Sequence, residues 1–285
     1  MQESEFELEN ELEVEGEGFL GGLLGESEFE GELEGFGETP LGEGEGEGLF
    51  ELEGELEGEQ FSFGKIFSSI KKLAAKAAPI LKQVAKVAAP IVGTAVGGPL
   101  GGKIGSFLGN ALGEGELEYE FEFETEGESE AEFETVMRGP LSEQQGIGEL
   151  MAAIASQAAT EQEAEAQMGG AIVISLSPQD RATLKNVIPS LTRGASVLTR
   201  ILRGRQATRM MTRIVPTIVK RTAVTLKKQA DAGHPITKAA AAKSMARQTR
   251  KVLSSPSICA HALQRNVNAT RAVTRRTTAR QAFAY

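Results

Sequence analysis

The sequence predicts a mainly α-helical protein with disordered acidic low-complexity arms and a small C-terminal helical bundle. Three observations lead to this fold class. The charges are sorted into blocks of one sign, two long segments have apolar residues at helical spacing, and the remaining chain is rich in Glu-Gly repeats. The 285 residues include 33 Gly, no Trp and only 5% aromatic residues, so that a large core is hard to build from this chain.

The charge blocks divide the chain into five expected segments. Residues 1–63 contain 22 Glu and no base, residues 64–112 seven Lys and no acid, and residues 113–135 eleven Glu and no base. The acidic repeat is expected to extend over 113–140, followed by an Ala/Glu-rich helix and linker at 141–170 and a basic helical bundle at 171–285. This last segment holds 22 Lys or Arg against two Asp. Ordinary globular surfaces intersperse both signs, so this protein is a polyampholyte organised in blocks.

The two acidic segments predict disorder at neutral pH. From Glu3 to Glu17 every odd position is Glu, which is the alternation of a strand, but a row of ionised carboxylates repels itself. Three interpretations remain open: a solvated spacer, a guard that neutralises the basic blocks, and a metal site. The metal site is the least favoured, because the spaced Asp residues of a calcium loop are absent from the sequence.

Residues 64–112 begin with a cationic amphipathic helix. On a helical wheel the lysines fall within an arc of about 140°, and the large apolar residues fill the opposite side. Such a helix is typical of those that lie in a membrane interface. The membrane-binding residues predicted on this basis are Lys65, Lys71, Lys72, Lys76, Lys82 and Lys86, together with Ile66, Phe67, Ile70, Leu73, Leu81 and Val84.

A glycine pattern follows this helix. Glycines recur at intervals of four, and such small residues allow close helix packing in lipid. The predicted packing positions are Gly93, Gly97, Gly101, Gly105 and Gly109. Pro79 and Pro90 are expected to kink the helix without ending it, and a turn is expected near Gly97. The alternative to membrane activity is an amphipathic hairpin packed on the C-terminal module.

The stretch from Lys71-Lys72-Leu73 to Pro90 resembles cationic amphipathic antimicrobial peptides of the cecropin kind, followed by a glycine zipper. This resemblance covers about 50 residues and concerns a physical class. It implies binding to anionic membranes. The whole layout also resembles uncharacterised bacterial proteins that are rich in Glu-Phe-Glu and Gly-Glu repeats and have a basic helical tail.

A series of helices is predicted from Ser142 onward. One short helix is expected to start there, and Ser177-Pro178-Gln179-Asp180 has the pattern of a capping box that starts another. Further helices are expected over about 178–188, 190–203, 205–231, 236–253 and 257–282, with breaks at Gly204, Gly233-His234-Pro235 and Ser255-Pro256. The short connections favour a small bundle of antiparallel neighbours.

Bases recur on the faces of these helices. The predicted anion-binding residues are Arg193, Arg200, Arg203, Arg209, Arg213 and Lys220. The chain's own Glu blocks or an anionic membrane surface are favoured as partners over nucleic acid, because the segment has few aromatic residues and no nucleic-acid docking motif. Self-association through opposite charges is a further expectation.

The sequence predicts neither catalysis nor a cofactor. Only two His are present, and Cys259 and His261 lack neighbouring ligands that would complete a metal site, so Cys259 is expected to be a buried, inert thiol. No signal peptide is expected, which places the chain in the cytoplasm until a non-classical route exports it, or at a membrane.

Three function classes fit these features. The first is a bacterial membrane-active protein of toxin or bacteriocin type, in which the acidic arms mask the cationic helix. The second is a structural or interaction protein of a surface or assembly, whose opposite-charge blocks associate. The third is a nucleic-acid-binding protein that uses the basic C-terminal module.

Overall fold

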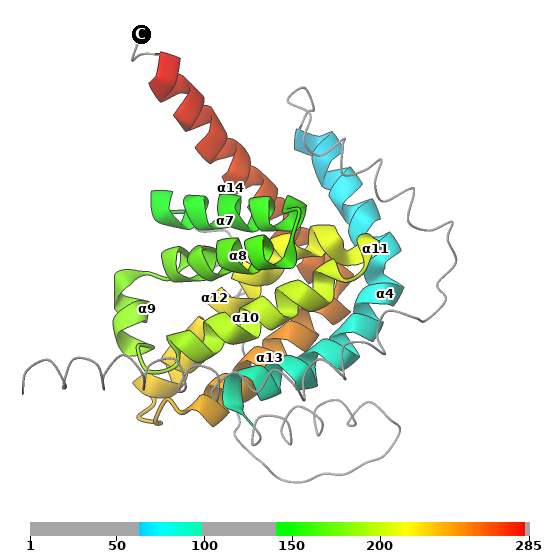
Figure 1. Cartoon of the computed structure of the whole chain (residues 1–285). Coiled ribbons are helices and arrows are strands. Elements are labelled where there is room, and N and C mark those ends of the chain that lie inside the picture. The colour runs from blue at the N-terminus through cyan, green and yellow to red at the C-terminus, as the bar shows by residue number, and fades with distance from the viewer. Residues whose placement is uncertain (1–62, 99–140, 283–285) are drawn as a thin grey trace, which may run out of the picture. The chain divides into compact units, whose positions relative to one another are not determined.

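The regular structure of the described residues is entirely helical. The computed structural model describes residues 63–98 and 141–282, and within them it confirms the predicted helical bundle (Figure 1). The acidic arms lie outside the described residues, as does the disorder predicted for them. In chain order the elements are α4 (Phe63–Gly97), α7 (Glu143–Gln157), α8 (Glu161–Ser175), α9 (Pro178–Thr183), α10 (Ile188–Arg203), α11 (Gln206–Arg209), the 3-10 helix η1 (Met210–Ile214), α12 (Val215–Asp231), α13 (Lys238–Ser254) and α14 (Pro256–Ala282).

Helix α4 is one continuous helix of 35 residues that runs through both prolines. It ends where the glycine-rich turn was expected. Gly98 has a φ of +67°, a left-handed conformation that favours glycine, and its amide donates to the carbonyl of Thr94 at 2.7 Å. The expected second half of a glycine-zipper hairpin lies outside the described residues.

Helices α7 and α8 form a pair joined by a short loop. Ser142 caps α7 in a reciprocal capping box with Gln145, and the Thr160 hydroxyl accepts from the amide of Glu163 to start α8. The segment boundary expected at residue 170 falls inside α8, which corrects the division between 141–170 and 171–285. Residues on both sides of this boundary, Met168 and Ile172, are fully buried in the bundle.

The C-terminal helices follow the predicted order with two differences. The helix expected over 178–188 stops at Thr183, and a turn leads into α10. The helix expected over 205–231 is divided into α11, η1 and α12. Pro216 lies in the first turn of α12, where its missing amide is tolerated, and the preceding turn tightens to the 3-10 form. Ser177 caps α9 as expected, with its hydroxyl accepting from the amide of Asp180 at 3.1 Å.

The core lies between α4, α10, α13 and α14, with α7 and α8 packed across one side (Figure 1). Helix α4 contacts α13 along much of its length and also contacts α10, α14 and α11. The alternative expectation was an amphipathic hairpin packed on the C-terminal module, and its first arm, α4, packs in this way. The second arm lies outside the described residues. The bundle begins in α4 rather than at residue 171.

Glycines permit the closest helix contacts in this bundle. A methyl group added at Gly148 of α7 would clash with the Ser175 hydroxyl and lie 2.9 Å from the backbone oxygen of Ala171. We therefore expect Gly148→Ala to lower the free energy of unfolding by about 1–3 kcal/mol. Gly169→Ala is the matched control, because its nearest neighbour would be a Thr192 methyl group at 3.6 Å.

The control substitution is expected to raise the free energy of unfolding by about 0.5–1 kcal/mol, since alanine is the better helix former. Urea unfolding of the two variants measures both changes. Equal effects of the two substitutions would contradict the close packing of α7 on α8.

Candidate anionic-surface interface

Among the side chains that the structure describes, α4 exposes its lysines and buries its large apolar residues, as its amphipathic pattern predicts. We call Lys71, Lys72, Lys76, Lys82 and Lys86 the lysine face; all five are exposed. On the opposite side Ile70, Leu73, Leu81 and Val84 are at most 1% exposed, because α10, α13 and α14 cover them. The side chains of Lys65, Ile66 and Phe67 lie outside the described residues. The described apolar residues of the predicted membrane-binding set are therefore inaccessible in this conformation.

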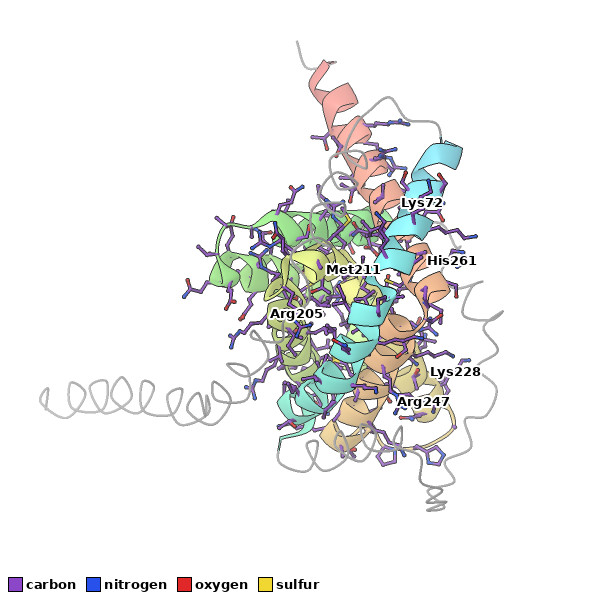
Figure 2. All side chains as sticks on the ribbon, turned by 90° about the vertical axis from the view of Figure 1, so that its right-hand side faces the viewer. Lys72, Arg205, Met211, Lys228, Arg247 and His261 are labelled. Carbon is purple, nitrogen blue, oxygen red and sulfur yellow. The ribbon has the colours of Figure 1, made fainter. Side chains whose placement is uncertain are left out.

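The helices around the lysine face contain no acidic residue. Neither α4, α10, α13 nor α14 includes an Asp or Glu. Figure 2 looks onto the side of the bundle that carries α4 and labels Lys72 near one end of this helix. Over residues 63–98 and 141–282 together, 28 Lys or Arg face seven Asp or Glu, a net charge of +21. Such a charge creates a potential that attracts polyanions over distances longer than a single contact.

Helix α4 also passes the length and composition criteria for a membrane-spanning helix. Within the described residues only Ser68–Gly97, which is 30 residues long, does so. In its most apolar window 56% of the residues are buried in the bundle. Core helices of soluble proteins meet the same criteria, so this property alone does not place α4 in a membrane.

Two of the predicted helix-packing glycines fall in the described residues. Gly93 is buried within α4. A methyl group added at Gly97 would lie 2.7 Å from the Cβ of Ala242, so this glycine allows α4 and α13 to approach closely. The contact lies inside the protein rather than between helices in lipid. Gly101, Gly105 and Gly109 lie outside the described residues.

The predicted anion-binding residues do not share one exposed surface. Arg193 is exposed, whereas Arg203 and Arg213 are only 6% and 4% exposed. Arg203 donates to the backbone oxygens of α7's last turn and the residue after it, namely Ala155, Ser156 at 3.3 Å and Ala158 at 2.7 Å. Arg213 donates to the hydroxyl of Ser156 at 3.2 Å. These two guanidinium groups therefore provide hydrogen-bond donors to the C-terminal end of α7, where the helix dipole favours positive charge.

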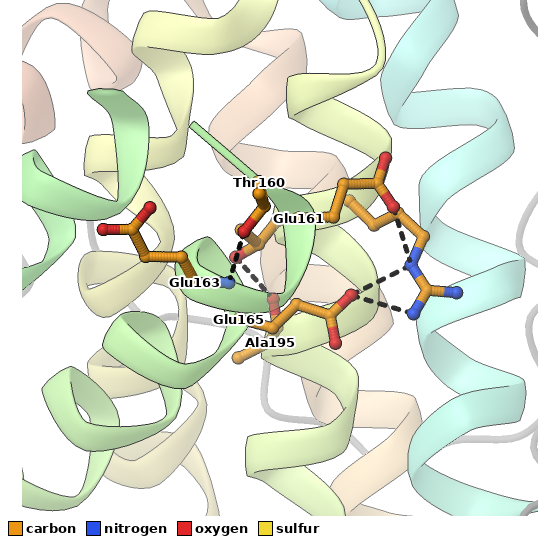
Figure 3. A network of polar contacts seen from close by, with 7 residues as sticks. Thr160, Glu161, Glu163, Glu165 and Ala195 are labelled. Atoms are coloured by element: carbon orange, nitrogen blue, oxygen red, sulfur yellow. Dashed lines mark hydrogen bonds and ion pairs between the residues drawn. The ribbon is translucent and has the colours of Figure 1, made fainter. Parts of the chain in front are cut away.

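Arg200 binds the first turns of α8. Its Nη2 lies 2.8 Å from a carboxylate oxygen of Glu165, and its Nε lies 3.8 Å from Glu161 (Figure 3). Lys227 similarly lies 3.7 Å from Asp180. Arg200 and Lys227 are thus paired with acids of α8 and α9, which are part of the same bundle.

Lys220 lies near a buried polar cluster that links α7 and α14. The Asn266 amide donates to the backbone oxygen and to a side-chain oxygen of Glu149, both at 2.8 Å, and the Nε of Arg265 lies 3.4 Å from the Glu149 carboxylate. Burial raises the pKa of Glu149 above its usual value, although the charge of Arg265 and the Asn266 hydrogen bond oppose this shift. Burial and the charge of Arg265 lower the pKa of Lys220 to about 8.

The lowered pKa of Lys220 predicts a pH-dependent stability. Below about pH 8 Lys220 is charged in the folded protein, where its ammonium group is poorly solvated, and this lowers the free energy of unfolding. As the pH rises from about 8 toward 10.5, the ordinary pKa of lysine, the folded protein loses this charge and the free energy of unfolding rises. We expect Lys220→Met to stabilise the protein at pH 7 by about 1 kcal/mol, a figure reduced for the partial exposure of this side chain.

Urea unfolding at several pH values between 7 and 10 tests this expectation. Stability should rise with pH more steeply in the wild type than in Lys220→Met, while Lys238→Met, which alters an exposed lysine, should follow the wild type. Parallel pH profiles for all three proteins would contradict the assignment to Lys220.

Sequence reasoning missed the buried polar residues that join helices. Arg221 of α12 is 2% exposed and donates to the Gln248 side chain of α13 at 2.8 Å, and Gln248 donates in turn to the Thr225 hydroxyl. For Glu149, the available signal of a buried polar contact was its position among the apolar residues of α7. The sequence offers no comparable signal for Gln248.

Cys259 is fully buried, as expected. Burial raises the pKa of its thiol to about 12, and its sulfur lies 3.6 Å from that of Met211, so it is an inert core residue. His261 is exposed. Among the residues that the structure describes, no group of three or more His, Cys, Asp or Glu side chains is placed to hold a metal ion.

Over the described residues, the fold and the surface together define a basic helical bundle with a lysine-rich side, formed by helices that contain no Asp or Glu. No protein-family model matches this chain, and searches of the curated proteins and of the solved structures found no significant match.

Proposed function

We propose that this chain is a non-enzymatic, membrane-active protein of the toxin or bacteriocin type, stored in a folded state. The observation that carries the proposal is the orientation of α4. Its lysine face is exposed, and the described helices around it contain no Asp or Glu, while its apolar face, which a membrane interface would require, is buried against the bundle. In the first step the lysine face binds anionic lipid. In the second step α4 leaves the bundle, which exposes its apolar face to the membrane.

The acidic arms act in this proposal as a mask over the lysine face. Residues 1–63 and 113–135 carry charges of −22 and −11, and they precede and follow α4 in the chain. Because they are tethered, their local concentration is in the millimolar range, as for short flexible linkers. Protonation of Glu near pH ~4.3 would weaken the mask while Lys stays charged.

The lysine face predicts strong binding to anionic vesicles. In the full-length protein, Lys76→Glu together with Lys82→Glu should weaken binding about a thousandfold, since each Lys near an anionic surface contributes ~1 kcal/mol and each reversal changes the attraction by about twice that amount. The matched control is Lys185→Glu with Arg193→Glu, which reverses two exposed bases on other elements.

Co-sedimentation with phosphatidylglycerol-containing vesicles measures this binding at pH 7 and pH 4.5. The control should lose less than about tenfold, because neither of its charges is on α4. Equal losses for both variants would mean that overall charge, not α4, drives binding. Binding of the wild type that increases at pH 4.5 supports the mask, and unchanged binding supports the interpretation of the arms as spacers.

A structural or interaction protein is the second candidate function. The pairing of Arg200 with Glu165 and of Lys227 with Asp180 favours it, because these contacts are associations of opposite charges from different helices. This candidate predicts salt-sensitive self-association in solution and no preference for anionic over neutral vesicles. Analytical ultracentrifugation at low and high salt distinguishes it from the membrane-active candidate.

A further inference from the structure

Two basic helices terminate at the same end of the bundle. The N-terminal turns of α4 and the C-terminal turns of α14 lie there in both views, and the two helices contact each other (Figure 1 and Figure 2). Over these turns four bases are exposed, and we call them the basic end: Lys72 and Lys76 of α4, and Arg275 and Arg276 of α14. The fold therefore brings bases from distant parts of the chain onto one end of the bundle.

The described part of the chain does not neutralise the basic end. Within residues 63–98 and 141–282, none of its four side chains forms a hydrogen bond or an ion pair. Helices α10, α11 and α13, which pack on α4, contain no Asp or Glu. Helix α7 packs on α14 and adds Glu143 in its first turn and Glu149, which lies in the buried cluster with Arg265. An anionic segment that covered the basic end would therefore reduce the repulsion between its charges.

The segment that leads into α4 has a matching charge and spacing. In residues 51–59, which we call the proximal repeat, every second residue is a glutamate: Glu51, Glu53, Glu55, Glu57 and Glu59. In an extended chain every second side chain lies on one face, at intervals of about 6.6 Å. Bases four residues apart on a helix, such as Lys72 and Lys76, are about 6 Å apart along its axis. Successive carboxylates can therefore lie opposite successive bases.

The length of chain before α4 allows the proximal repeat to reach both helices. Glu59 is four residues from Phe63, where α4 begins, so it can lie up to about 13 Å from that point. Lys72 is nine residues into the helix, about 14 Å from its start. An extended chain from Glu51 to Glu59 spans up to about 26 Å, whereas the axes of packed helices are about 8–10 Å apart. One repeat can therefore contact α4 and α14 at the same time.

We propose that the proximal repeat docks on the basic end and forms a strap between α4 and α14. Its carboxylates pair with Lys72 and Lys76 on one helix and with Arg275 and Arg276 on the other, where the guanidinium groups can each donate two hydrogen bonds to a carboxylate. The strap holds the N-terminal half of α4 in the bundle. This role rests on the proposed function, because it names the part of the acidic arm that restrains α4, but the docking itself requires no membrane.

Thermal unfolding of the full-length protein at low ionic strength tests the strap. Glutamine in place of all five glutamates of the proximal repeat should lower the melting temperature by about 3–6 °C, as expected for the loss of several exposed ion pairs. The matched control places glutamine at Glu3, Glu5, Glu7, Glu9 and Glu11, which changes the charge of the same arm equally.

The control should lower the melting temperature by at most about 1 °C, because its tether to α4 is several times longer and its local concentration is correspondingly lower. In 1 M salt both differences should disappear, since the Debye length falls to about 3 Å. Equal losses for the proximal and control substitutions at low salt would overturn the proposal.

Arg275→Gln with Arg276→Gln tests the surface on α14. In this background the loss caused by the proximal substitutions should shrink by about half or more, since two of the four bases are absent. Lys238→Gln with Arg247→Gln is the control, because it removes two exposed bases of α13 and should leave the loss unchanged.

Two further outcomes would overturn the strap: an unchanged loss in the α14 variant, and a loss that depends on protein concentration, which would assign the repeat to a second copy. The expected coupling together with no release of dye from vesicles would support the strap and contradict the proposed function alone.

Discussion

Replacing Arg203 by methionine is expected to lower the free energy of unfolding by about 3–5 kcal/mol. The guanidinium group of Arg203 donates to three backbone oxygens around the C-terminus of α7, and the side chain is 6% exposed. Methionine preserves the length and the packing of the arginine stem but removes every donor. The carbonyls it leaves are buried, and water cannot readily replace the lost bonds.

The control for this prediction is Arg193→Met, which removes an exposed arginine from the same helix. Its effect should remain within about 0.5 kcal/mol, as for most surface substitutions. Chemical unfolding of the two variants gives both values. A similar, small effect of both substitutions would show that Arg203 acts as a surface base, as its sequence spacing first indicated.

The sequence predicts the helices well because their signals are local. The cap at Ser177 and the breaks at Gly204 and Pro256 depend on neighbouring residues only, and the structure has them where they were expected. The division of residues 205–231 was not predicted, since the packing of η1 on α7 and α10 is not a local property.

The partners of each helix face could not be predicted in the same way. Periodicity shows that one side of α4 is apolar, but lipid and the Ala-rich face of α13 both suit such a side. The same limit applies to Arg203 and Arg213. Their spacing indicates a basic surface, whereas the acceptors that bury them belong to α7, about 50 residues earlier in the chain.

Release of α4 from α13 is the central step of the proposed function, so holding the two helices together should abolish membrane damage. A methyl group at Gly97 would lie 2.7 Å from the Cβ of Ala242, and a disulfide needs about 3.5–4.5 Å between the two Cβ atoms. A shift of about 1 Å therefore allows a disulfide in the double variant Gly97→Cys with Ala242→Cys. Cys259→Ala in the same protein removes the competing thiol, which is buried and inert.

The reduced and oxidised forms of this variant are matched, because they differ only in the crosslink. The oxidised form should still bind phosphatidylglycerol vesicles, since the lysine face stays exposed. Its release of an entrapped dye should fall at least tenfold, because the C-terminal half of α4 cannot separate from α13. The reduced form should release dye as the wild type does.

Dye release from anionic vesicles by the oxidised and reduced forms, at equal amounts of bound protein, is therefore the most direct test of the account. The account predicts release by the reduced form and little or none by the oxidised form. Equal release by both forms would show that α4 need not leave the bundle, and would contradict the proposal that this helix is stored there for insertion into a membrane.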